Sequence, residues 1–157
     1  MPILITVKKL LSLTFSLICL LAVAQDNVPF DKEFFPNDKD GLKEAKSHFK
    51  VADKIFDGGN KGYFNLCIPD YLAAQAFNPN NAELNYKLGG CYLYSPVKDK
   101  SLEYIQKSYA INPAYDNYNI QYLLGRGYHL NSMWTEAKDA YEQQLVVLKT
   151  AQATDAE

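Results

Sequence analysis

Apolar and small side chains recur at a fixed helical spacing through residues 79–145. A Leu-Gly pair is followed by a Tyr three residues after the Gly, and a small residue follows nine residues after that Tyr. This spacing starts once at Leu88 and again at Leu124. Because positions three and four apart share a helix face, the pattern predicts two antiparallel helix pairs with small residues where the axes approach. The positions expected to pack the pairs are Ala52, Cys67, Tyr71, Leu88, Gly89, Tyr92, Ser101, Ile105, Leu124, Gly125, Tyr128, Ala137 and Tyr141.

An earlier pair follows the same plan with one departure. Ala52 and Cys67 are fifteen residues apart, whereas the equivalent Gly89 and Ser101 are twelve apart. The first pair therefore has a three-residue insertion, or its second helix starts differently. Pro69 is tolerated if it lies in the first turn of that helix, and it would kink a helix that begins earlier. The expected pairs span residues 42–79, 82–113 and 116–148.

The closing prolines set the period of the repeat. Pro79 and Pro113 lie thirty-four residues apart, which is the period of the tetratricopeptide repeat. The order of Leu-Gly, aromatic, small residue, aromatic and Pro resembles that family over residues 42–148. The resemblance implies an all-α fold, an α-α superhelix built as a right-handed array of about three helix pairs.

In that family the first helices of the pairs line a concave groove that holds extended peptides. The resemblance therefore implies a partner-binding face in which tyrosines supply rigid area and Arg126 seeks a carboxylate. The alternative is that Tyr86 and Tyr122 pack between neighbouring pairs. The residues expected on the concave face are Glu83, Tyr86, Tyr94, Asn119, Tyr122, Arg126 and His129.

Two runs carry a closer resemblance, NPNNAELNYKLGGCYLYSPVKDKSLEYIQKSYAINP and IQYLLGRGYHLNSMWTEAKDAYEQQL. They are similar to the N-terminal repeat region of exported Bacteroidetes envelope proteins that end in an OmpA-like domain. The resemblance implies a scaffold of the periplasm associated with the outer membrane, with partners among envelope or type IX secretion and gliding proteins. Peptidoglycan binding is not implied, because this sequence stops after the repeats.

Residues 1–24 have the composition of a secretory signal peptide. Lys8 and Lys9 precede an apolar run over 10–21, and Ala22-Val23-Ala24 forms a small-x-small cleavage site. The run is shorter than the roughly 20 residues of a membrane span, so a cleaved leader is favoured over an anchor. Cleavage would change the net charge from −2 to −4. Cys19 is not expected to carry lipid, since the bulky Ile18 precedes it.

The length of 157 residues and the composition of the sequence predict one globular domain without a basic stripe, which disfavours nucleic-acid binding. Residues 25–41 are predicted to be an irregular lead-in, in which Asp38 or Asp40 caps the first helix. Their spacing does not fit a calcium loop. Residues 149–157 are predicted to be a frayed tail.

Candidate chemistry is sparse. His48 and His129 have no further ligand at metal-site spacing, so neither a metal nor a cofactor is expected. Two interpretations of Cys67 and Cys91 stay open: a disulfide in an oxidising compartment, or two small buried residues at helix contacts, which the pattern favours. No nucleophile–base set, phosphate loop or carboxylate pair indicates an enzyme.

The sequence thus predicts a non-catalytic protein–protein interaction scaffold whose protein or peptide partner it does not identify. One alternative is a structural spacer within a larger envelope protein, and a helical enzyme or small-ligand binder is a further one. The apolar stretch 145–148 is expected to contact an oligomer partner, a neighbouring domain, or chain beyond this sequence.

Overall fold

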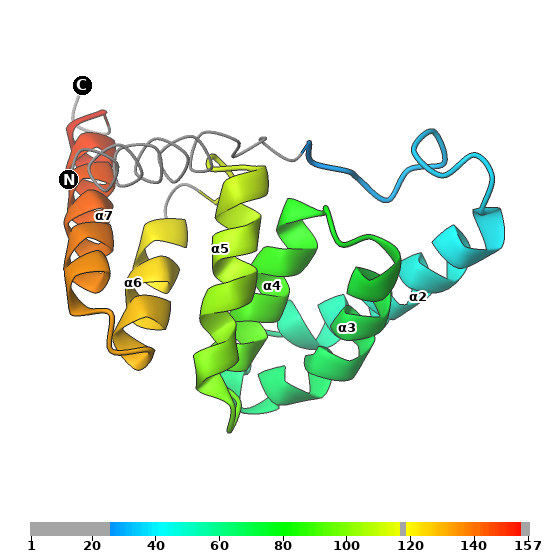
Figure 1. Ribbon diagram of the computed structural model, residues 1–157, viewed down its shortest axis with the longest axis horizontal. Helices are drawn as coiled ribbons and strands as arrows, with labels where there is room; N and C mark the ends of the chain where they lie inside the picture. Colours follow the sequence, from blue (N-terminus) through cyan, green and yellow to red (C-terminus); the bar gives the residue numbers. More distant parts are fainter. Residues whose placement is uncertain (1–25, 117–118, 155–157) are drawn as a thin grey trace, which may run out of the picture.

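A computed structural model describes residues 26–116 and 119–154, and all regular secondary structure in these ranges is helical (Figure 1). The predicted all-α class is confirmed for them. The predicted signal peptide, residues 1–24, lies outside the described residues. The elements are α2 (Lys39–Phe56), the 3₁₀ helix η1 (Lys61–Cys67), α3 (Ile68–Phe77), α4 (Ala82–Leu93), the 3₁₀ helix η2 (Lys98–Lys100), α5 (Ser101–Ile111), α6 (Ile120–Leu130) and α7 (Trp134–Thr154).

Helix α2 begins three residues before the predicted position, at Lys39 rather than at residue 42. The cause is a side-chain cap, because the Asp38 carboxylate accepts a hydrogen bond of 2.9 Å from the backbone N–H of Gly41. Such a cap satisfies one of the free N–H groups at a helix start. The predicted lead-in, 25–41, is therefore helical in its last three residues.

The second segment of the first pair changes type along its length. Lys61–Cys67 is a 3₁₀ helix, and the α-helix begins only at Ile68, with Pro69 in its first turn. Proline is tolerated there because a first-turn N–H has no partner within the helix. The insertion before Cys67 is thus folded as a short separate helix, and Pro69 causes no kink within α3.

The C-terminal helix α7 extends to Thr154, so residues 149–154 of the predicted frayed tail are helical. The Thr150 hydroxyl donates a hydrogen bond of 3.0 Å to the Val146 carbonyl within the last turns. Ala, Gln and Lys, which are good helix formers, dominate this stretch and allow it to continue without tertiary cover.

Consecutive helices contact one another along the whole array, and α4 lies at its centre (Figure 1). Leu88 of α4 belongs to an apolar cluster with α2, η1 and α3, whereas Leu93 belongs to a second cluster with α5, α6 and α7. The glycines predicted at close approach do meet a neighbouring helix. A Cβ atom on Gly89 would lie 2.5 Å from Ile105 Cγ1, and one on Gly125 would lie 2.5 Å from the Tyr141 ring.

A buried cation joins α2 to α4. Lys87 Nζ lies 2.9 Å from both Asp53 Oδ1 and Glu83 Oε1, and it also lies over the rings of Phe49 and Phe56. Burial acts to lower the pKa of Lys87, but the hydrogen bonds to the two carboxylates outweigh it and raise that pKa. Because a buried charge without its partner is strongly destabilising, this group fixes the register of the two helices.

We expect Gly89→Ala to destabilise the protein by up to about 2 kcal/mol. Overpacking against Ile105 costs about 1–3 kcal/mol, and the higher helix propensity of Ala recovers about 1 kcal/mol. Gly90→Ala is the matched control, since a Cβ there would lie 3.6 Å from Phe56, an ordinary contact. Urea unfolding of both variants tests this, and equal stabilities would contradict a close crossing at Gly89.

We also expect stability to fall at alkaline pH. Burial, and then the hydrogen bond that its hydroxyl donates to Asp53, raise the pKa of Tyr71. Burial also raises the pKa of Tyr115 to about 12. When a phenol has a higher pKa in the folded state than in the unfolded state, its contribution to stability is fully present below the unfolded pKa of about 10. This contribution is lost as pH rises through the folded pKa.

For Tyr71 alone, the loss above pH 10 amounts to about 1.4 kcal/mol per pH unit. The free energy of unfolding, measured at successive pH values from neutral to strongly alkaline, checks this. A Tyr115→Phe variant should show a shallower fall over the same range. A stability that stays constant through pH 11 (about one unit above the unfolded value) would be incompatible with buried phenols.

Candidate functional site

Side chains from α2, η1, α4 and the start of α6 surround a hollow of about 230 Å³, which we call the groove. Of the seven residues predicted to contact a partner, four line it, and they come from α4, from α6 and from the residues that cap these two helices. The groove is lined by Phe56, Lys61, Phe64, Tyr86, Gly90, Tyr94, Asn119, Tyr122 and Leu123.

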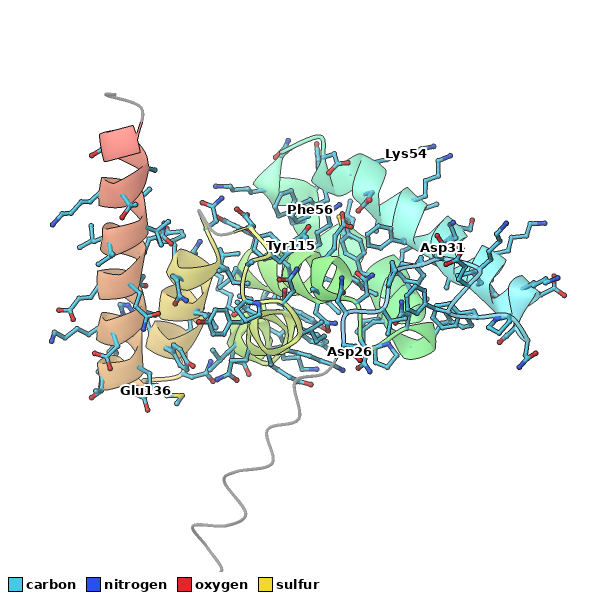
Figure 2. All side chains as sticks on the ribbon, turned by 90° about the horizontal axis from the view of Figure 1, so that it is seen from above. Asp26, Asp31, Lys54, Phe56, Tyr115 and Glu136 are labelled. Carbon is cyan, nitrogen blue, oxygen red and sulfur yellow. The ribbon has the colours of Figure 1, made fainter. Side chains whose placement is uncertain are left out.

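An aromatic surface forms one side of the groove. The rings of Phe56 and Phe64 stack with centroids 4.7 Å apart, and Phe64 meets Tyr94 edge-on at 5.6 Å. Figure 2 shows Phe56 over the middle of the molecule, whereas Lys54 on the same helix lies toward its edge. Gly90 has no side chain to fill the space in front of Phe56, so this surface stays accessible.

The Tyr94 phenol lies between two cations. Arg126 Nη1 donates a hydrogen bond of 3.0 Å to the Tyr94 hydroxyl, and Lys61 Nζ lies 5.1 Å from the centre of the Tyr94 ring. The Arg126 guanidinium is also 5.9 Å from the ring of Tyr122. Arg126 therefore borders the groove through contacts with two of its tyrosines.

Electrostatics around Tyr94 favour negative charge. Burial acts to raise the pKa of Tyr94, but hydrogen bonds from Lys61 and Arg126 outweigh it, and the net pKa is lowered. In the described residues neither cation forms an ion pair with a carboxylate. Two basic side chains thus converge on one aromatic ring without a neutralising partner, an arrangement that suits an anionic group of a ligand.

The two tyrosines whose role was left open differ in the structure. The Tyr86 hydroxyl donates a hydrogen bond to Asp116, and its ring packs edge-on against Tyr115 at 5.2 Å. Tyr86 is therefore largely committed to holding the loop after α5. Tyr122 is 45% exposed and faces solvent at the groove. The packing interpretation suits Tyr86, and the groove interpretation suits Tyr122.

Three other predicted residues have local partners. Glu83 is drawn to Lys87 one turn along α4, and it borders a separate hollow beside Phe49 rather than the groove. His129 packs edge-on against Trp134 at 5.1 Å where α7 begins. Asn119 lines the groove, but its amide also donates to the Asp116 carboxylate at 3.2 Å.

Besides Leu123, sequence reasoning missed three groove residues of the first helix pair, Phe56, Lys61 and Phe64. They lie at the end of α2 and in η1, where the pattern of the other pairs is interrupted. The signal was the insertion between Ala52 and Cys67, because the added residues form the segment that delivers Lys61 and Phe64. Their orientation could not be derived from a repeat that the segment does not follow.

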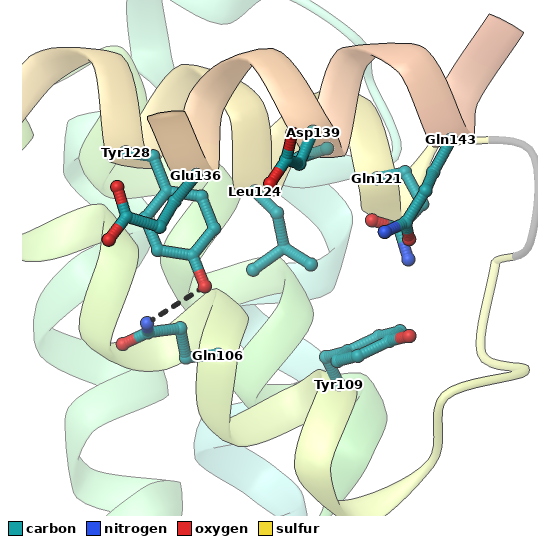
Figure 3. Close-up of a pocket in the computed structure, with 9 residues that line it drawn as sticks. Gln106, Tyr109, Gln121, Leu124, Tyr128, Glu136, Asp139 and Gln143 are labelled. Carbon is teal, nitrogen blue, oxygen red and sulfur yellow. Dashed lines mark hydrogen bonds between the residues drawn. The ribbon is translucent and has the colours of Figure 1, made fainter. Parts of the chain in front are cut away.

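A second hollow, of about 320 Å³, lies between α5, α6 and α7 (Figure 3). Gln106 Nε2 donates a hydrogen bond of 3.2 Å to the Tyr128 hydroxyl across it. The charged groups that line it are the exposed carboxylates of Glu136 and Asp139 on α7. Among the described residues, no Lys or Arg side chain lines it, so we take the groove as the stronger candidate.

The described ranges hold no cluster of metal-ligating side chains. No three His, Cys, Asp or Glu side chains of residues 26–116 and 119–154 gather as a metal site. His48 Nδ1 lies 2.6 Å from Asp70 Oδ1 and ties α2 to α3. Among the helices described, none is long and apolar enough to cross a membrane.

Comparison of the chain with known families, characterised proteins and solved structures finds no match. The role of the groove therefore depends on its own geometry. It offers an aromatic surface, an exposed tyrosine and two unpaired cations, which together suit a ligand that carries both an apolar and an anionic group.

We expect Arg126→Gln to raise the pKa of Tyr94, because the guanidinium that favours the phenolate is removed. NMR titration of tyrosine-labelled protein measures this, with the Tyr94→Phe variant assigning the signal. Lys138→Gln is the control, since Lys138 pairs with Glu142 on the exposed surface of α7. An unchanged Tyr94 titration in Arg126→Gln would show that the two side chains do not interact in solution.

Proposed function

We propose that this protein is a non-catalytic interaction module of the tetratricopeptide type, in which the groove binds a segment of a partner protein. Two features support the repeat assignment. Glycines recur at equivalent helix crossings, at Gly89 and Gly125. The small residues Ser101 and Ala137 are buried on the facing helices, as the repeat pattern requires.

The observation that carries the binding proposal is the pair of unpaired cations on Tyr94. Lys61 and Arg126 approach this ring from different elements, η1 and α6. An acidic side chain of a partner, or its terminal carboxylate, would gain charge-assisted hydrogen bonds there. The exposed ring of Tyr122 would cover an adjacent apolar side chain.

The size of the groove favours a peptide side chain over a cofactor. Pockets for small molecules and cofactors usually measure about 300–1,000 Å³ and enclose most of the ligand. The groove, at about 230 Å³, holds one or two side chains of an extended segment. We therefore propose an extended partner segment with an acidic residue next to an apolar or aromatic one.

The proposed location is the periplasm, in association with the outer membrane. Support comes from the leader-like composition of residues 1–24 and from the resemblance to exported envelope proteins. A structural spacer is the second candidate. It is favoured by the apolar side chains that α7 exposes at Leu145, Val146 and Leu148, which would suit contact with a neighbouring domain.

Short fluorescent peptides test the groove directly. Peptides with a central Glu beside Phe should bind more tightly than otherwise identical peptides with Gln or Lys. Arg126→Ala should weaken binding of the Glu peptide about tenfold, because a charged hydrogen bond contributes about 1.5 kcal/mol or more. The double variant Tyr122→Ala, Arg126→Ala should lose most of the remaining affinity.

Lys138→Ala is the matched control, because it removes an exposed cation outside the groove. Circular dichroism should show an unchanged helical melt for all three variants. Equal affinity for the Glu, Gln and Lys peptides would refute an anion-selective groove. Absence of binding to every peptide would instead favour the spacer.

A further inference from the structure

Two cysteines meet in the core between the first and second helix pairs. Cys67 is the last residue of η1, and Cys91 lies on α4, twenty-four residues later in the chain. Both side chains are 0% exposed, and both belong to the apolar cluster that includes Tyr71 and Leu88. The structure holds both as free thiols.

The equivalent positions one repeat later indicate how near the backbones are at this crossing. Cys67 corresponds to Ser101 in the repeat pattern, and Cys91 corresponds to Gly127. A Cβ atom on Gly127 would lie 3.2 Å from the Cα atom of Leu102, the residue after Ser101. The second crossing is thus tighter than most side-chain contacts, and the first crossing has cysteine at both of the equivalent positions.

A disulfide requires a close helix crossing of this kind. Linked cysteines have Cα atoms about 4.4–6.8 Å apart and Cβ atoms about 3.5–4.5 Å apart, which needs two backbones in near contact. The thiols of Cys67 and Cys91 also act on each other. Burial raises the pKa of both, and the neighbouring Cys67 sulfur raises the pKa of Cys91 further.

We propose that Cys67 and Cys91 form an intramolecular disulfide that links the first helix pair to α4. The oxidant is a small disulfide of the glutathione class. The thiolate of one cysteine attacks it, forming a mixed disulfide and releasing one small thiol. The second cysteine then attacks the mixed disulfide, so that the Cys67–Cys91 bond forms, the second small thiol leaves, and the two protein protons end on the two released thiols.

The burial of the thiols determines when this reaction occurs. In the folded protein both are protonated and out of contact with solvent, so exchange with an external disulfide is slow. In the unfolded chain both thiols are accessible, and folding brings them together in the core. The bond should therefore form during folding in an oxidising medium rather than afterwards. This inference is independent of the proposed role of the groove.

Oxidative refolding tests the proposal. The full chain with Cys19→Ser, which removes its third cysteine, is unfolded in guanidinium and refolded with reduced and oxidised glutathione. The monomeric helical product is then digested with trypsin without reduction. Because Lys87 lies between the two cysteines, peptides 62–87 and 88–98 should stay joined, with a mass lower by two hydrogen atoms than their sum.

The oxidised protein should also melt above the same protein after reduction, by on the order of 10 °C. In the Cys19→Ser background, a further Cys67→Ser or Cys91→Ala substitution should abolish the linked peptide. The melting comparison uses only the Cys19→Ser protein, which retains both Cys67 and Cys91. Two outcomes would overturn the proposal. One is a native refolded product in which both thiols stay free, as expected of two small buried residues. The other is an oxidised form that melts below the reduced form.

Discussion

The fold depends on burying one helix, α4, on nearly all sides. Ten of its twelve residues are buried, including Lys87 and Asn85. An α-helix without an exposed face must pack against neighbours on all sides. Helix α4 has small residues where other helices cross it, and its buried charge has polar partners. Gly89 allows α5 to approach closely, and Lys87 forms an ion pair with Asp53 on α2. Both apolar clusters meet on this helix, so in the described residues α4 joins the first pair to the helices that follow it.

The groove is a consequence of the same arrangement. Near the C-terminal end of α4, Gly90 and Tyr94 face the space between the first pair and α6. Arg126 reaches the Tyr94 hydroxyl from α6, and Lys61 reaches its ring from η1. The positive charge of the groove therefore comes from η1 and α6, whose cations meet at Tyr94 at the end of α4. A change at the adjacent crossing, at Gly89, should alter the groove as well as stability, because Gly90 lines the groove.

Wherever the repeat pattern holds, the sequence predicted the close helix crossings, because helical spacing and small residues determine which helix faces meet. The tetratricopeptide resemblance, combined with that spacing, predicted Tyr94 and Tyr122 on the concave face, with packing between pairs as the alternative for Tyr122, and both residues line the groove. Prediction was poorer where local contacts outweigh the pattern. Glu83 turns to Lys87, and His129 turns to Trp134. Those choices depend on side-chain partners in three dimensions, which spacing along one chain does not specify.

The insertion in the first pair connects the groove to the cysteines. It forms η1, which carries Lys61 and Phe64 into the groove and ends at Cys67 in the core. A short 3₁₀ helix has poorer hydrogen-bond geometry than an α-helix and is held mainly by its contacts. A bond from Cys67 to α4 would fix the end of η1 and so restrict Lys61 and Phe64 relative to Tyr94. Restricting binding residues before the ligand arrives lowers the entropy cost of association. On this argument, oxidation of a site that the ligand never touches would still increase the affinity of the groove.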